Sequence, residues 1–290
     1  MFERIISIVF PVFAIILGGW LYGRKHKPDM AIANRLNLDV FLPALILTAL
    51  ADKSFDLFTY RHLAISTLIM VIGSGILAWP IAKLTNVSPR TFVPPMMFNN
   101  SANLGLPLAV LAFGDAALAP AVVMFIVSTF LHFSLGVWLL DHKAKWWDLW
   151  RNPVVIASLA GLFLSFTGLE IWSPLKLGLK MLGDISIPLL LFALGVRVAD
   201  SSLVGIKIGL IGALVRPILG ISITYLMIVL FRLQGLQASM LLLFGALPPA
   251  VLNYMFSERY QQEPTVVASM VLIGNIVAIA IIPVVLAAIL

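Results

Sequence analysis

Apolar segments of about 20 residues follow one another along almost the whole chain, and this pattern limits the possible folds more than any other feature. A helix of about 20 apolar residues is long enough to cross a lipid bilayer. Only 11% of the 290 residues are charged, whereas soluble domains carry roughly 25%. The sequence therefore predicts an all-α polytopic membrane protein with ten transmembrane helices. Their approximate spans are residues 4–23, 32–51, 60–82, 91–113, 116–140, 153–169, 175–197, 206–231, 237–258 and 265–289.

The span at residues 91–113 is interrupted by polar residues and helix breakers. The interruption reads FNNSANLGLP, from Phe98 to Pro107. Pro107 removes a backbone donor and frees the carbonyl of Asn103, and Gly105 loosens the turn between them. Unwound backbone at membrane depth persists only where protein or a water-filled cavity satisfies it. We therefore expect a broken helix whose break is a binding site.

A weak internal repeat with an offset of 145 residues divides the chain into two halves. It is carried by an aspartate followed four positions later by a proline, which occurs as Asp39 with Pro43 and as Asp184 with Pro188. The same offset aligns Asn103 with Pro248, where the adjacent prolines Pro248 and Pro249 interrupt the ninth span. Five spans per half is an odd number, so the halves must insert in opposite orientations. We expect two inverted five-helix repeats, residues 1–145 and 146–290, an arrangement typical of secondary transporters.

Basic residues are distributed unequally between the two sides of this topology. With the N-terminus outside, the inner connections hold twelve lysines and arginines and the outer ones six. Because inner loops carry the excess of positive charge, both termini are expected outside the cytoplasm. The net charge of +6 then reflects topology rather than nucleic-acid binding. The connection Asp141–Asn152, with Trp146, Trp147 and Trp150, is expected to lie as a helix at the headgroup level.

Two motifs resemble those of the auxin efflux carrier family, which includes plant auxin carriers and bacterial dicarboxylate permeases. The first is NSANLGLPL from Asn100, followed by Phe113–Gly114, and the second is ALPPAVLNYMFSERY from Ala246, followed by Pro264. The resemblance covers the whole chain in order and spacing. It implies a fold like that of bile-acid symporters and sodium–proton antiporters. In that fold, helices 1, 2, 6 and 7 form a scaffold, often dimeric, and helices 3–5 and 8–10 an elevator-like transport domain.

The resemblance also bears on the site. It implies that Asn100 contacts the carboxylate region of the substrate. Pro249 occupies a position where the plant carriers usually have a polar residue. The resemblance therefore does not imply that auxin itself is the substrate.

The two breaks are expected to form an anion site where the half-helices begin, near Leu104–Pro107 and near Pro249. Each helix N-terminus acts as roughly half a positive charge with unpaired N–H donors, and amide side chains orient a carboxylate by hydrogen bonds. The expected substrate-binding residues are Asn99, Asn100, Ser101, Asn103, Gly105 and Asn253, and the expected helix-breaking residues are Pro107, Pro248 and Pro249.

Most of these residues have a second interpretation. The asparagines also suit hydrogen bonding between helices; for Asn99 both roles stay open, whereas Asn100 and Asn103, three apart on one helical face, favour binding. The candidate coupling residues Asp39 and Asp184 suit a proton relay or a cation site. They also suit ion pairs with residues one turn earlier, which are Arg35 for Asp39 and Lys180 for Asp184. For Arg216, His132 and Asn275 we expect structural roles.

We expect a secondary transporter of small organic anions (mono- or dicarboxylates, auxin-like acids) that works by alternating access in a bacterial inner (plasma) membrane. The alternative is a sodium- or proton-coupled symporter or antiporter of the same fold; a channel and a membrane sensor are the rivals from other classes. With no phosphate-binding loop, metal-ligand spacing or nucleophile–base pair, we expect neither an enzyme nor a cofactor or metal site. The expected partners are the anion, the bilayer and a second copy of the chain at the scaffold helices, but no nucleic acid.

Overall fold

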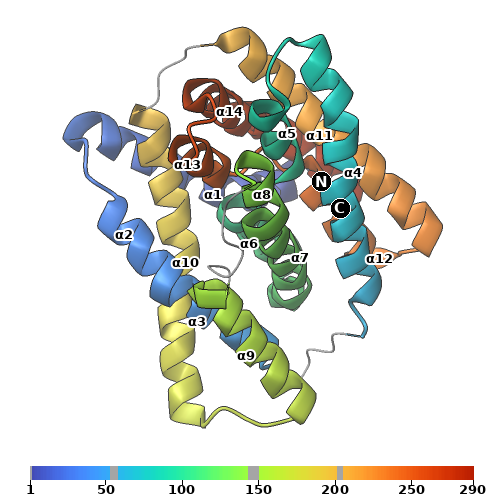
Figure 1. Cartoon of the computed structure of the whole chain (residues 1–290). Helices are drawn as coiled ribbons and strands as arrows, with labels where there is room; N and C mark the ends of the chain where they lie inside the picture. The colour runs from blue at the N-terminus through green and yellow to red at the C-terminus, as the bar shows by residue number, and fades with distance from the viewer. Residues whose placement is uncertain (1, 53–57, 143–149, 201–204) are drawn as a thin grey trace.

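The computed structural model describes residues 2–52, 58–142, 150–200 and 205–290, and its regular elements in these ranges are helices (Figure 1). Among these described residues, seven helices are long and apolar enough to cross a membrane, and three shorter apolar helices cover residues 101–113, 153–167 and 235–246. The seven long ones are Glu3–His26, Ala31–Leu50, Arg61–Leu84, Asp115–Leu140, Ser173–Ala199, Ile206–Phe231 and Pro264–Ile289. The chain is therefore an all-helical, multi-pass membrane protein.

The elements follow one another with short connections. The first part of the chain contains α1 (Phe2–His26), α2 (Ala31–Leu36), the π turn η1 (Asn37–Phe41), α3 (Leu42–Leu50), α4 (Arg61–Leu84), α5 (Pro89–Met97), the π turn η2 (Ser101–Gly105), α6 (Leu106–Phe113), the 3-10 turn η3 (Asp115–Ala117), α7 (Leu118–Leu131), the π turn η4 (His132–Gly136) and α8 (Val137–Leu140). The second part contains α9 (Pro153–Thr167), α10 (Ser173–Asp200), α11 (Ile206–Phe231), α12 (Gly235–Ala246), α13 (Val251–Arg259) and α14 (Pro264–Ile289).

The helices pack in two groups. The α1/α10 group consists of α1, α2, η1, α3, α9 and α10, and its most extensive contacts join α1 with α10 and α3 with α9 and α10. The α4/α11 group consists of α4 to α8 and α11 to α14, with α11 packed against α4, α12 and α14. In Figure 1, α3, α9 and α10 lie together on one side and α4, α11 and α12 on the other.

Glycines allow the closest approach within the α1/α10 group. A Cβ atom at Gly195 of α10 would lie 2.0 Å from the carbonyl oxygen of Ile16 in α1, and one at Gly19 would lie 2.2 Å from that of Phe192. Small residues at such contacts let helix backbones approach each other and gain van der Waals packing in a bilayer.

Two helices are interrupted, and in both the interruption is extended backbone. α5 ends at Met97 and the next helical turn begins at Ser101; α12 ends at Ala246 and α13 begins at Val251. The second half-helix of the first pair thus begins before the expected Leu104–Pro107. Pro107 is the second residue of α6 and follows the π turn η2, so it lies inside the second half-helix rather than at the break.

The alignment of Asn103 with Pro248 is wrong. The starts of α4 and α11, at residues 61 and 206, lie 145 apart, whereas the ends of α5 and α12, at 97 and 246, lie 149 apart. The difference arises mainly because α12 has 12 residues and α5 has 9. As a result Asn99, not Asn103, lies opposite the proline pair, in an isolated antiparallel bridge with Pro249.

Candidate functional site

The two interruptions cross and satisfy each other's backbone. The N–H of Asn100 donates to the carbonyl of Pro248 at 2.8 Å, and the N–H of Ala250 donates to the carbonyl of Phe98 at 2.9 Å. These two bonds flank the bridge between Asn99 and Pro249. Extended backbone, costly inside a membrane, is thereby paired within the protein.

Two asparagine side chains bind the carbonyl groups that the breaks release. Asn99 Nδ2 donates to the Phe244 carbonyl at 2.7 Å, and Asn253 Nδ2 donates to the carbonyls of Phe98 and Ala250, both at 3.0 Å. The Oδ1 atom of Asn99 is buried and has no hydrogen-bond partner among the described residues. Asn99 and Asn253 therefore join the two interrupted helices to each other.

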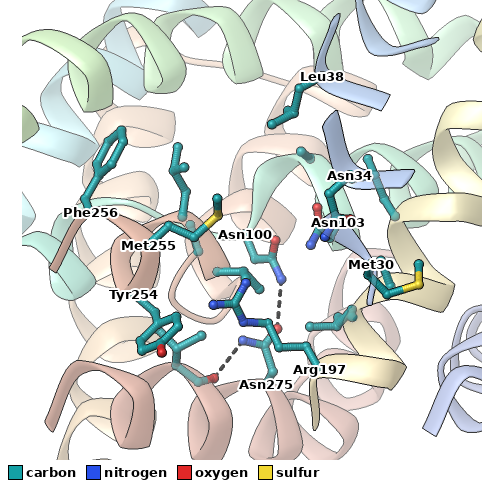
Figure 2. A pocket seen from close by; sticks show the side chains of 18 of the residues that line it. Met30, Asn34, Leu38, Asn100, Asn103, Arg197, Tyr254, Met255, Phe256 and Asn275 are labelled. Atoms are coloured by element: carbon teal, nitrogen blue, oxygen red, sulfur yellow. Dashed lines mark hydrogen bonds between the residues drawn. The ribbon is translucent and has the colours of Figure 1, made fainter. Parts of the chain in front are cut away.

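A pair of asparagines connects the crossing to α14. Asn100 Nδ2 donates to Asn275 Oδ1 at 2.8 Å (Figure 2). Asn275 Nδ2 donates to the carbonyls of Pro249 at 3.1 Å and Val271 at 2.7 Å. Both asparagine side chains line a cavity. Asn275, for which a packing role was expected, is thus part of the site.

The cavity has a volume of about 1160 Å³ and lies between the two helix groups. The α1/α10 group contributes the α1–α2 connection, residues of η1 and the last turns of α10, and the α4/α11 group contributes residues of η2, α7, η4, α13 and α14. Of the expected binding residues, four belong to its wall: Asn99, Asn100, Ser101 and Asn103. The described wall does not include Gly105, Asn253, Pro107, Pro248 or Pro249. Gly105 instead packs against Phe244 and Leu247.

Helix N-termini face this cavity. Ala102 and Asn103, in the first turn of the helix that starts at Ser101, line it, as do Val251 and Leu252 in the first turn of α13. The first N–H groups of a helix lack intrahelical partners and carry its partial positive charge. The carbonyls of Phe244 in α12 and of Phe98, which follows α5, accept bonds from Asn99 and Asn253. The positive helix ends therefore remain available to a ligand.

Arg216 occupies a structural position, as expected. It is fully buried in α11, and its Nη1 donates to the carbonyl of Gly245, at the C-terminal end of α12, at 3.3 Å. A cation stabilises that end of a helix dipole. Arg216 is not among the described residues that line the cavity.

The two aspartates of the repeat form the ion pairs with residues one turn earlier. Arg35 Nε lies 3.9 Å from Asp39 Oδ2, and Lys180 Nζ lies 2.9 Å from Asp184 Oδ2. The side chains of Asp39 and Asp184 are 50% and 58% exposed. Asp39 also lines the cavity, whereas Asp184 is not among its described lining residues.

Two further lining residues were not expected in the site. His132, in η4, is buried and stacks on Phe98 with ring centroids 4.0 Å apart. Arg197, in the last turn of α10, lies with its guanidinium carbon 4.5 Å from the ring centroid of Tyr254. The sequence marks His132 as a candidate site residue, because a histidine within an apolar span is unusual. It does not mark Arg197, because basic residues are common at the ends of membrane spans.

The expected surface helix at Asp141–Asn152 falls mostly on residues 143–149, which include Trp146 and Trp147 and lie outside the described residues. Trp150 is described and is 46% exposed. Asn152 caps α9, because its Oδ1 accepts a hydrogen bond from the N–H of Val154 at 2.9 Å.

Comparison with known proteins gives a consistent result across the chain. The model of a family described as membrane transport protein matches residues 4–145 and 137–286. An uncharacterized transporter of Methanocaldococcus jannaschii is 22% identical over 92% of this chain and 93% of its own length. One from Methanothermobacter thermautotrophicus is 26% identical over 95% of each chain. Auxin efflux carrier component 8 of Arabidopsis thaliana is 26% identical over 50% of this chain and 41% of its own.

Proposed function

Since the chain belongs to the membrane transport protein family, which includes auxin efflux carriers and consists of transporters rather than enzymes, we propose that it is a secondary transporter of small organic anions. The observation that carries this proposal is the arrangement of the helix ends at the crossing. The carbonyls of Phe244 and Phe98, at the C-terminal ends of α12 and α5, are hydrogen-bonded within the protein, and the N-terminal turns line the cavity. Such a site attracts negative charge, and the amides of Asn100 and Asn103 would orient a carboxylate.

We further propose ten membrane spans in two inverted repeats and an elevator-type movement. The short helices α9, α5–α6 and α12–α13 would supply the three spans beyond the seven long ones. The α1/α10 group would be the scaffold, joined to a second copy of the chain, and the α4/α11 group would carry the substrate. Two facts support this division: each group packs mainly within itself, and the cavity lies between them.

The cavity opens toward connections that the charge distribution assigns to the cytoplasm. Its wall includes Lys27 and Asp29 between α1 and α2, Asn152 before α9, and Pro264 at the start of α14. With both termini outside a bacterial inner membrane, as we propose, this conformation would be the inward-facing one.

Uptake into proteoliposomes of the purified protein tests the function. The probes are radiolabelled phenylacetate, indole-3-acetate, benzoate and succinate. We expect saturable uptake of at least one acid, together with exchange of internal labelled acid for external unlabelled acid. The protein is not an anion transporter of this class if no acid enters above empty vesicles, and it is a channel if uptake occurs without exchange.

The cation-coupled alternative is kept because Asp39 lines the cavity. The same vesicles, given a sodium or a proton gradient, distinguish it. A gradient response that disappears in Asp39→Asn would support coupling through this carboxylate, and a response that persists would exclude Asp39 as the coupling residue.

A further inference from the structure

Arg197 is a charged side chain in the wall of a largely apolar and amide-lined cavity. It comes from α10, in the α1/α10 group, and its guanidinium lies over the ring of Tyr254 from α13, in the other group, at 4.5 Å. Figure 2 shows both side chains in the cavity that Asn100 and Asn275 also line. A guanidinium over an aromatic face is held in orientation by its attraction to the ring.

Tyr254 connects this cation to the half-helix that begins at the crossing. Tyr254 lies in the first turn of α13, which begins at Val251 immediately after the crossing. The ring that the guanidinium contacts therefore belongs to the half-helix whose first turn lines the cavity.

The other charged residues of the described wall lie on the exposed α1–α2 connection, in η1 or at the exposed end of α13. Lys27 and Asp29 are exposed on the α1–α2 connection, and Asp39 is paired with Arg35. Glu258 is exposed, accepts a hydrogen bond from the Tyr254 hydroxyl at 3.1 Å and attracts the Arg197 guanidinium. Among the charged residues of the described wall, Arg197 is therefore the cation that contacts the half-helix beginning at the crossing.

We propose that Arg197 is the residue that selects anions: it pairs with the single carboxylate of a monocarboxylate substrate, with Tyr254 holding the guanidinium in place. The planar fork of arginine matches a carboxylate with two parallel hydrogen bonds. One cation near the crossing matches one carboxylate, so the substrate class is a monocarboxylate with an apolar body rather than a dicarboxylate. This inference rests on the proposed function and adds the charge-recognising residue to it.

The test compares an acid with its neutral amide. Affinities of indole-3-acetate and indole-3-acetamide, and of phenylacetate and phenylacetamide, are measured by thermal stabilisation of the purified full chain. For Arg197→Gln we expect the affinity for the acid to fall about tenfold or more and the affinity for the amide to change less than about twofold. In the unmodified protein, succinate should bind more weakly than either monocarboxylate.

The matched control is Arg259→Gln. Arg259 is also an arginine over a tyrosine ring, 5.5 Å from the centroid of Tyr260, but it is exposed and outside the described cavity wall. Its substitution should leave the preference for acid over amide unchanged. If Arg197→Gln does not fold, Arg197→Lys replaces it, with an expected loss of a few-fold for the acid alone.

Three results overturn the inference. Equal losses for acid and amide would show that Arg197 only supports the fold, an unchanged preference would show that it does not contact the carboxylate, and tighter binding of succinate would show that the substrate class is wrong. In all three, binding of some acid by the unmodified protein leaves the proposed function standing. Failure of every acid to bind or enter vesicles would overturn both.

Discussion

At the scale of the residue, the asparagines of one short motif divide into two roles. Asn99 holds the carbonyl of Phe244, whereas Asn100 binds Asn275, and both line the cavity. The helical spacing of Asn100 and Asn103 could not separate these roles, because residues 98–100 lie in the break between α5 and η2, where Phe98 is extended. Successive side chains of extended backbone point to opposite sides, so neighbouring asparagines reach different partners.

This division predicts different effects of two alanine substitutions. Asn100→Ala should lower acid uptake about tenfold or more and lower the unfolding temperature by only a few degrees, because one net hydrogen bond contributes about 1 kcal/mol. Asn99→Ala should lower the unfolding temperature more, because the C-terminal end of α12 loses its partner for Phe244. Uptake in vesicles and fluorescence-detected unfolding measure the two effects. Loss of folded protein in Asn100→Ala would instead indicate a structural role.

At the scale of the element, the crossing depends on close contact between α11 and the end of α12. A Cβ atom at Gly220 would lie 2.0 Å from the carbonyl oxygen of Gly245 and 2.4 Å from Arg216 Nη1. The same arginine donates to that carbonyl. The position of the break is thus supported by a neighbouring helix as well as by the prolines within it.

Gly220→Ala should therefore destabilise the protein, even though alanine favours helices over glycine. Overpacking of this kind costs about 1–3 kcal/mol, which corresponds to an unfolding temperature lower by several degrees. The control is Gly178→Ala in α10, where a Cβ atom would meet nothing within 4 Å; it should be neutral or slightly stabilising. Equal unfolding temperatures for the two variants would contradict the role of this contact.

At the scale of the whole molecule, two helix groups meet around the cavity and along a smaller apolar cavity of about 200 Å³. The smaller one is lined by Ile15 of α1 and Leu111 of α6, among others. These two residues belong to opposite groups. The proposed elevator movement requires their surroundings to change during transport.

A reversible cross-link tests that movement. The chain contains no cysteine, so Ile15→Cys with Leu111→Cys can be joined by a short cleavable thiol reagent. We expect uptake to stop on cross-linking and to return on reduction. The control is Asp52→Cys with Lys176→Cys, whose charged atoms lie 3.3 Å apart beside α3 and in α10, within one group; its cross-link should not affect uptake. Full uptake with Ile15 and Leu111 positions cross-linked would exclude the movement.

The sequence by itself determined the helical membrane class, the order of the segments and the two places where helices break. These features depend on local composition, since a run of about 20 apolar residues suits a bilayer and adjacent prolines and asparagines do not suit a continuous helix. The tertiary structure decided which polar residues bind one another and which face the cavity. Asn100 and Asn275, or Arg197 and Tyr254, come together only through packing of distant helices. The offset between the two sequence repeats cannot predict such pairings. Because α12 is three residues longer than α5, the residues that face each other at the crossing are not those that the offset aligns.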